Sequence, residues 1–309
     1  MSRILALGAV LLLAGCGGGN TARDDGRLVV VATTGQVADL AARIGGDRVR
    51  VTALMGPGID PHLYKASAGD VERLRQADLI LYNGLHLEAK LGDVLARLAA
   101  RQPTLAVADA VPADLLIFPP AFAEAHDPHI WFDVQLWRRT IEPVAARLAE
   151  LDPAHAAAYR ERAAAYAQEL DRLDAEVRTT FAAIPEDRRV LITAHDAFNY
   201  LGRAYGLEVR GLQGISTATE AGTADVRDLA AFIAERRIPA VFVESSVSPR
   251  AIAAVQAAVR AHGFAVEVGG ELYSDALGDE GTPAGTYVGM VRHNANTIAA
   301  ALRGAVGHE

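Results

Sequence analysis

The sequence predicts an α/β fold of two similar lobes, each a mostly parallel sheet flanked by helices, bridged by one long rigid α-helix. Short apolar runs alternate with helical patterns from residue 28 onward, which is typical of parallel sheets covered by helices. The alternation stops at residues 152–184 and restarts after Pro185. The chain has 309 residues, enough for two domains that each bury a core.

Residues 27–151 are predicted to form the N-terminal lobe. We expect strands at residues 28–32, 49–55, 77–82 and 104–108, and helices at residues 36–44, 68–76, 87–100 and 134–151. No Gly-x-Gly-x-x-Gly motif follows the first strand, so a dinucleotide site is not expected.

Residues 152–185 are predicted to form the bridging helix. Asp152 and Pro153 supply an N-cap and a proline at the first helical position, and residues 154–184 contain neither glycine nor proline. One helix of this length would measure about 45 Å and run along both lobes. The alternative is two helices with a break that the sequence does not reveal.

Residues 186–309 are predicted to form the C-terminal lobe, in which the alternation of strands and helices resumes. We expect strands at residues 190–193, 208–212, 240–243 and 265–268, and helices at residues 197–205, 224–236, 249–262 and 284–303.

Residues 1–16 are predicted to be an export signal, because one positive charge precedes an apolar run too short to span a bilayer. The signal ends in Leu-Ala-Gly-Cys, which resembles the bacterial lipobox, so we expect Cys16 to be lipid-modified. Cys16 is also the only cysteine, which excludes an internal disulfide. Residues 17–26 are expected to be a flexible tether to a bacterial membrane, with the folded body facing the periplasm or cell exterior.

The composition is that of a folded protein and not of a disordered one, with 51% hydrophobic and 22% charged residues. The net charge of −8 at pH 7 gives no general reason to bind nucleic acid, whereas a cationic ligand fits its sign. We expect a monomer.

The tripeptide Asp-Pro-His occurs twice, at residues 60–62 and 127–129. Proline has a fixed φ and no backbone N–H, so each following histidine is expected on a stiff loop. Asp60 and Asp127 could each accept the second ring N–H of their histidine and so fix which nitrogen faces a metal. His126 is expected to be a supporting residue, because His-Asp-Pro-His cannot form the helical turn that would aim both rings together.

Four possible metal ligands lie in loops or at strand ends, two in each half of the chain: His62, His129, His195 and Asp275. Ligands of open parallel sheets bind at the carboxyl ends of the strands. The four positions therefore predict a divalent-cation site between the lobes, formed by three imidazoles and one carboxylate.

The chain resembles the metal-receptor family of bacterial ABC importers, the solute-binding lipoproteins for zinc and manganese. The matching phrases lie at residues 57–64, 77–88, 126–131, 193–198, 214–222 and 270–278. The resemblance implies a metal held by His62, His129, His195 and Asp275, and delivery of that metal to a membrane permease powered by an ATPase. It extends over residues 28–305, nearly the whole mature chain.

Zinc is favoured as the transported ion, with manganese as the second candidate. Many manganese receptors of the family have glutamate at the third ligand, whereas this chain has His195, and imidazole is the softer ligand. Many zinc receptors carry a histidine-rich loop before the second ligand, whereas residues 117–125 contain no histidine.

Three other functions place different demands on the sequence. A metal-dependent hydrolase would keep one coordination position open for water, and neither His-Glu-x-x-His nor Gly-x-Ser-x-Gly occurs. A receptor for an organic metal chelate would line its cleft with aromatic residues or arginines. No feature of the sequence argues for or against a role as an adhesin in cell adhesion. We therefore expect a transport receptor and not an enzyme.

Overall fold

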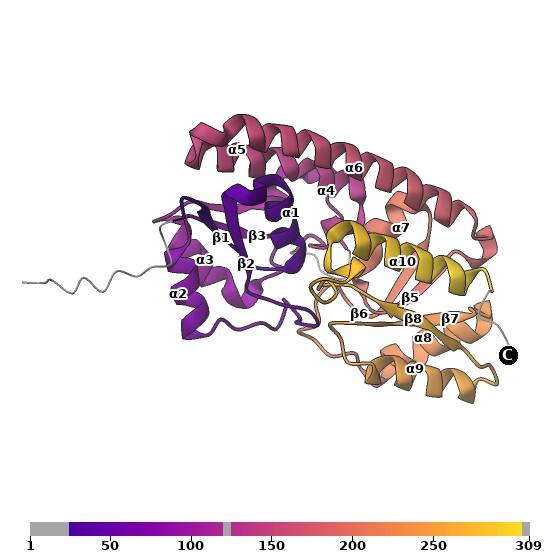
Figure 1. Cartoon of the computed structure of the whole chain (residues 1–309). Coiled ribbons are helices and arrows are strands. Elements are labelled where there is room, and N and C mark those ends of the chain that lie inside the picture. The colour runs from indigo at the N-terminus through magenta and orange to yellow at the C-terminus, as the bar shows by residue number, and fades with distance from the viewer. Residues whose placement is uncertain (1–24, 120–124, 305–309) are drawn as a thin grey trace, which may run out of the picture.

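Two α/β lobes lie side by side, and a long helix runs along both of them (Figure 1). The structure is a computed structural model that describes residues 25–119 and 125–304. The predicted export signal, Cys16 and most of the predicted tether lie outside the described residues. The predicted α/β class with a bridging helix is confirmed, and the lobe boundaries at residues 151/152 and 185/186 stay predictions.

The N-terminal lobe contains one parallel sheet with strand order β2-β1-β3-β4. Its strands are β1 (Leu28–Ala32), β2 (Val49–Ala53), β3 (Leu79–Tyr82) and β4 (Thr104–Ala106). Its helices are α1 (Gly35–Gly45), α2 (Ala68–Gln76) and α3 (Gly92–Ala99). Apolar side chains alternate between the two faces of β1, so Val30 and Val31 contribute to separate buried clusters.

The predicted helix at residues 134–151 is wrong as a single element. The structure has α4 (Val134–Arg139) and α5 (Ile141–Leu151), separated at Thr140. Pro143 has no N–H to donate to the carbonyl of Arg139, and the Thr140 hydroxyl donates to the Trp137 carbonyl at 2.7 Å. The missing proline donor and the Thr140 side-chain bond explain why the helix is interrupted at Thr140, less than one turn before Pro143.

The bridging helix α6 (Ala156–Ala182) is one uninterrupted helix, preceded by a 3₁₀ turn at Pro153–His155. Asp152 holds the start of this segment, because its carboxylate accepts the Tyr159 hydroxyl at 2.7 Å. The helix contacts α1 and α5 in the N-terminal lobe and α7 (Asn199–Tyr205) and α10 (Tyr287–Leu302) in the C-terminal lobe.

The C-terminal lobe differs from the predicted single sheet. Strand β5 (Val190–His195) pairs in parallel with β6 (Glu208–Gln213), and β7 (Ala240–Glu244) pairs with β8 (Glu267–Leu272). Strands β5 and β7 lie side by side (Figure 1), but no regular ladder joins them in the described chain. The remaining helices are α8 (Thr223–Arg236) and α9 (Arg250–Ala261).

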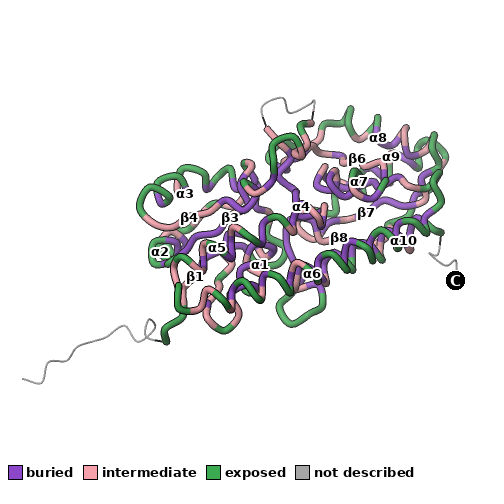
Figure 2. Tube along the Cα trace, turned by 90° about the horizontal axis from the view of Figure 1, so that it is seen from above, coloured by how far each residue is buried: buried purple, intermediate pink, exposed green. Residues whose placement is uncertain are grey.

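One of the three buried hydrophobic clusters of the described chain extends through both lobes. Large aromatic side chains of its centre are buried, among them Trp131, Trp137 and Tyr287. The Trp137 and Tyr287 rings stack at 5.4 Å between centroids, and the Tyr287 hydroxyl donates to the Trp131 carbonyl at 2.7 Å. Buried segments accordingly continue from one lobe into the other (Figure 2). A shared core limits how far the lobes can move apart.

Candidate metal centre

Four side chains from both lobes converge between the sheets. His62 lies in the loop between β2 and α2, and His129 directly precedes a 3₁₀ turn at Ile130–Phe132. His195 is the last residue of β5, and Asp275 follows β8. The four are 0–3% exposed, and one ligand atom from each lies within 4.8 Å of the others. In residues 25–119 and 125–304 no other group of three or more such side chains comes together in this way.

The Asp275 carboxylate lies at the centre of this cluster. Its Oδ1 is 3.4 Å from Nε2 of His129, and its Oδ2 is 3.3 Å from Nε2 of His195 and 3.7 Å from Nε2 of His62. None of these nitrogen and oxygen atoms has a hydrogen-bond partner within the described chain. Buried polar atoms without partners are unfavourable, and a shared cation would satisfy all of them. The residues therefore fit a metal ion.

His129 is oriented by Asp127, as the sequence led us to expect. One oxygen of Asp127 lies 2.7 Å from Nδ1 of His129 and accepts the His129 backbone N–H at 2.9 Å. The other oxygen accepts a hydrogen bond from the Asn199 side-chain amide at 3.0 Å. This arrangement leaves Nε2 of His129 facing the cluster, which is how outer carboxylates orient metal-binding histidines.

Glu244 lies beside the His195 ring as an ion-pair partner and was not predicted from the sequence. One of its oxygens accepts the His195 backbone N–H at 2.9 Å, and the other lies 2.6 Å from Nδ1 of His195. Glu244 is 4% exposed at the end of β7. The sequence does contain one indication of this role, because Glu244 is a charged residue at the end of an otherwise apolar strand.

Asp60 does not orient the His62 ring, so that expectation is wrong. Its carboxylate accepts the His62 backbone N–H at 2.8 Å and the Thr217 hydroxyl. The tight turn through Pro61 brings the backbone N–H within reach of Asp60, as in an Asx-turn. His126 lies outside the cluster, where its ring contacts Phe118 at 5.3 Å between centroids.

Charge and burial shift the protonation of the cluster. Burial lowers the pKa of His62 to about 3. Burial would also lower the pKa of His129, but Asp127 and Asp275 outweigh it and raise that pKa to about 9. Burial alone would raise the pKa of Asp275, whereas His195 and His129 hold it well below its usual value. At neutral pH the Asp275 carboxylate is therefore ionised, the His62 ring is neutral and the metal-free His129 ring is protonated.

The Asp275 loop is also tied to the N-terminal lobe. The carbonyl of Ser274 accepts the indole N–H of Trp131 at 3.1 Å and the side-chain amide of Gln36 at 3.4 Å. The Ser274 hydroxyl lies 2.9 Å from the Ser246 hydroxyl. Asp275 is thus held in place by contacts from both lobes.

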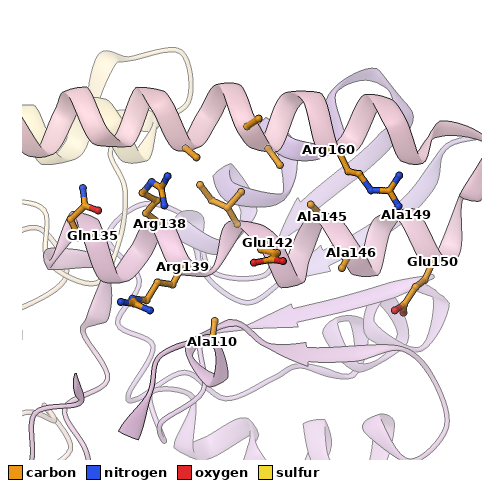
Figure 3. A pocket seen from close by; sticks show the side chains of 14 residues that line it. Ala110, Gln135, Arg138, Arg139, Glu142, Ala145, Ala146, Ala149, Glu150 and Arg160 are labelled. Carbon is orange, nitrogen blue, oxygen red and sulfur yellow. The ribbon is translucent and has the colours of Figure 1, made fainter. Parts of the chain in front are cut away.

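A groove lies away from this cluster, between α5 and α6 (Figure 3). Its volume is about 900 Å³, and small alanines such as Ala145 and Ala149 form much of its lining. Arg139, Glu142 and Arg160 extend from its walls. Among the described residues, none of the four clustered ligand side chains lines this groove.

Two α/β lobes bridged by one long helix, with a closed cluster of ligand side chains between them, define the class of helix-bridged solute receptors. The chain belongs to the family described as zinc-uptake complex component A periplasmic, whose family model matches residues 30–301. Members of this family are transport receptors and act outside the cytoplasm. In the described residues, no helix is long and apolar enough to cross a membrane.

Similar proteins cover almost the whole chain. It is 50% identical to the zinc-binding protein TroA of Treponema pallidum (strain Nichols) over 300 residues, which are 97% of this chain and 96% of TroA. It is 49% identical to the manganese-binding lipoprotein MntA of Bacillus subtilis (strain 168) over 296 residues, 96% of each chain. The solved structure of the periplasmic zinc binding protein TroA matches with a TM-score of 0.88 and 51% identity, covering 90% of this chain and 99% of that one.

Proposed function

We propose that this protein binds a divalent transition metal ion through His62, His129, His195 and Asp275 and delivers it to an ABC importer. The supporting observation is that four buried ligand side chains from both lobes meet with their ligand atoms unpartnered in the described chain. The metal is cargo, and the partners are the permease that accepts it and the ATPase that powers transport. Membership of a family of transport receptors supports this role.

Zinc is the favoured cargo, and manganese is the second candidate. Three imidazoles and one carboxylate form a nitrogen-rich set, which suits zinc better than manganese. One close relative is named for zinc and another for manganese, so the relatives alone favour neither ion.

A catalytic role is disfavoured by the number of ligands. Catalytic zinc sites use three protein ligands and keep a fourth position for water. Here four protein side chains surround one point, and all four are buried. The same enclosure disfavours an organic metal chelate, which needs an open cleft.

Cys16 is the proposed site of lipid attachment. The lipobox-like end of the export signal and the relatives named lipoproteins support this assignment. The anchor would hold a monomeric receptor near its permease.

Competition calorimetry with zinc and manganese, on protein lacking residues 1–16, tests the proposed function. We expect one ion per chain and tighter binding of zinc. Elemental analysis of the protein as isolated gives a second readout. A protein that binds neither ion would contradict the proposal, and tighter binding of manganese would overturn the choice of zinc.

A further inference from the structure

The loop that carries His62 is fixed to the N-terminal lobe at both ends. It comprises residues 54–67, between β2 and α2. At its start, the Met55 N–H donates to the Thr33 carbonyl at 3.0 Å. At its end, the Ser67 side chain caps α2. Between these anchors the loop contains no helix or strand, so contacts with its surroundings must hold its middle in place.

Asp60 joins the middle of this loop to the opposite lobe. One oxygen of its carboxylate accepts the His62 backbone N–H at 2.8 Å, and the other accepts the Thr217 hydroxyl. Thr217 is 157 residues further along the chain, in the loop after β6, and is 8% exposed. Asp60 is half-buried, and a hydrogen bond to its charged carboxylate is stronger than one between neutral groups.

His62 differs from the other two histidines in how it is held. His129 and His195 each have a carboxylate at Nδ1, whereas no carboxylate contacts Nδ1 of His62 among the described residues. The outer side of the His62 loop is exposed to solvent, with Ile59 41% and Leu63 49% exposed. Ile59 and Leu63 belong to no hydrophobic cluster of the described chain, whereas Met55, Tyr64 and Ala66 pack in the cluster beneath the sheet. An outward movement confined to residues 56–63 would therefore leave the hydrophobic clusters intact.

We propose that the hydrogen bond between Asp60 and Thr217 is a latch that keeps the His62 loop closed over a bound metal ion, and that its opening controls metal release. The inference rests on the proposed function, because a latch has a role only if the protein binds a metal ion and later releases it. Asp60 and Thr217 do not belong to the ligand cluster. Asp60 and Thr217 are positioning residues. When their bond breaks, His62 can withdraw while the better-held His129, His195 and Asp275 stay in place.

Dissociation of zinc tests the latch. Purified, zinc-loaded protein is mixed rapidly with an excess of chelator, and the release rate is compared with that of Thr217→Val, which keeps the shape of the side chain but removes the hydroxyl. We expect release to be about tenfold faster or more, as for loss of one hydrogen bond to a charged group. Thr217→Ser restores the hydroxyl and should release zinc at close to the wild-type rate.

Thr179→Val is the matched control, because the exposed Thr179 hydroxyl bonds only to its own helix, at the Ala175 carbonyl. Its release rate should equal that of the wild type. Asp60→Asn gives a second variant in which a neutral amide faces Thr217, and we expect it also to release zinc faster. If the bond between Asp60 and Thr217 only stabilised the fold, the metal-free variants would melt at a lower temperature than the wild type but would not release zinc faster.

The possible outcomes separate the latch from the proposed function. Faster release from Thr217→Val and Asp60→Asn, with wild-type rates for Thr217→Ser and Thr179→Val, supports the latch. If the wild type binds zinc and the folded Thr217→Val and Asp60→Asn variants release it at the wild-type rate, the latch is wrong and the proposed function stands. A wild-type protein that binds no zinc would overturn the latch together with zinc as its cargo.

Discussion

Two of the three histidines of the metal centre have a carboxylate beside the ring nitrogen that faces away from the cluster. Carboxylates of Asp127 and Glu244 lie at Nδ1 of His129 and His195, at 2.7 and 2.6 Å. Such outer carboxylates fix the ring orientation and make the ligand nitrogen more basic. The affinity of the site should therefore depend on residues that never touch the metal.

Replacement of Glu244 by glutamine is expected to weaken zinc binding. The glutamine can still accept the His195 backbone N–H, but it lacks the negative charge beside Nδ1. We expect a loss of about 10- to 100-fold in affinity, the usual effect of removing an outer carboxylate. Competition calorimetry measures it, with Glu267→Gln at the exposed start of β8 as the control. Equal affinities for Glu244→Gln and the wild type would exclude this role.

Zinc binding is expected to release protons at neutral pH. The pKa of His129 is raised to about 9, so below this pH the metal-free ring holds a proton that the metal must displace. Affinity should rise as the pH increases toward 9 and fall in mild acid. Calorimetry at pH 7 in buffers of different ionisation enthalpy detects the released protons. Identical heats in all buffers would contradict the prediction.

The orientation of His129 could be predicted from the sequence, whereas that of His195 could not. Asp127 is two positions from His129, so the local turn alone brings them together. Glu244 is 49 residues from His195, and their contact depends on β5 and β7 lying side by side. Long-range pairing of this kind leaves no local pattern in one sequence.

Elements were predicted well where hydrophobic periodicity was strong and less well near glycine and proline. Helix α2 and strand β1 begin and end where the sequence placed them. Strand β8 was expected at residues 265–268 but lies at Glu267–Leu272, because Gly269 and Gly270 weaken the strand pattern. Tertiary packing explains Gly269: a Cβ there would lie 2.7 Å from Cβ of Ala301 and 2.8 Å from the Phe242 ring.

Gly269→Ala is therefore expected to destabilise the fold. The added methyl group overfills the space between β8, α10 and β7, at a cost of about 1–3 kcal/mol in the free energy of unfolding. Gly92→Ala is the control, since nothing lies within 4 Å of a Cβ at the start of α3. It should be neutral or stabilising by up to about 1 kcal/mol. Urea denaturation measures both, and equal stability of the two variants would contradict the packing explanation.

At the scale of the whole molecule, the lobes are coupled by a shared core and by α6. The alternation of apolar runs predicted two lobes, but the sequence did not reveal that Trp131, Trp137 and Tyr287 join them through one buried cluster. We expect this packing and the single bridging helix to restrict closure to small shifts, so that local loops such as that of His62 perform most of the opening.

Metal is expected to stabilise the whole molecule. An ion that joins ligands from both lobes binds the native state far better than the unfolded chain, and zinc at 1,000 times Kd would add about 4 kcal/mol. The melting temperature of the dialysed protein should rise when zinc is added and fall again with a chelator. An unchanged melting temperature across added zinc and manganese would contradict metal binding between the lobes.

The zinc stoichiometry of His195→Ala, measured by equilibrium dialysis and elemental analysis, tests whether the four side chains bind the metal. His262→Ala, at the exposed end of α9, is the control. The four-ligand site predicts one zinc ion per chain for the wild type and for His262→Ala, and loss of that ion from His195→Ala at the same free zinc concentration. A His195→Ala variant that holds one zinc ion as tightly as the wild type would contradict the site.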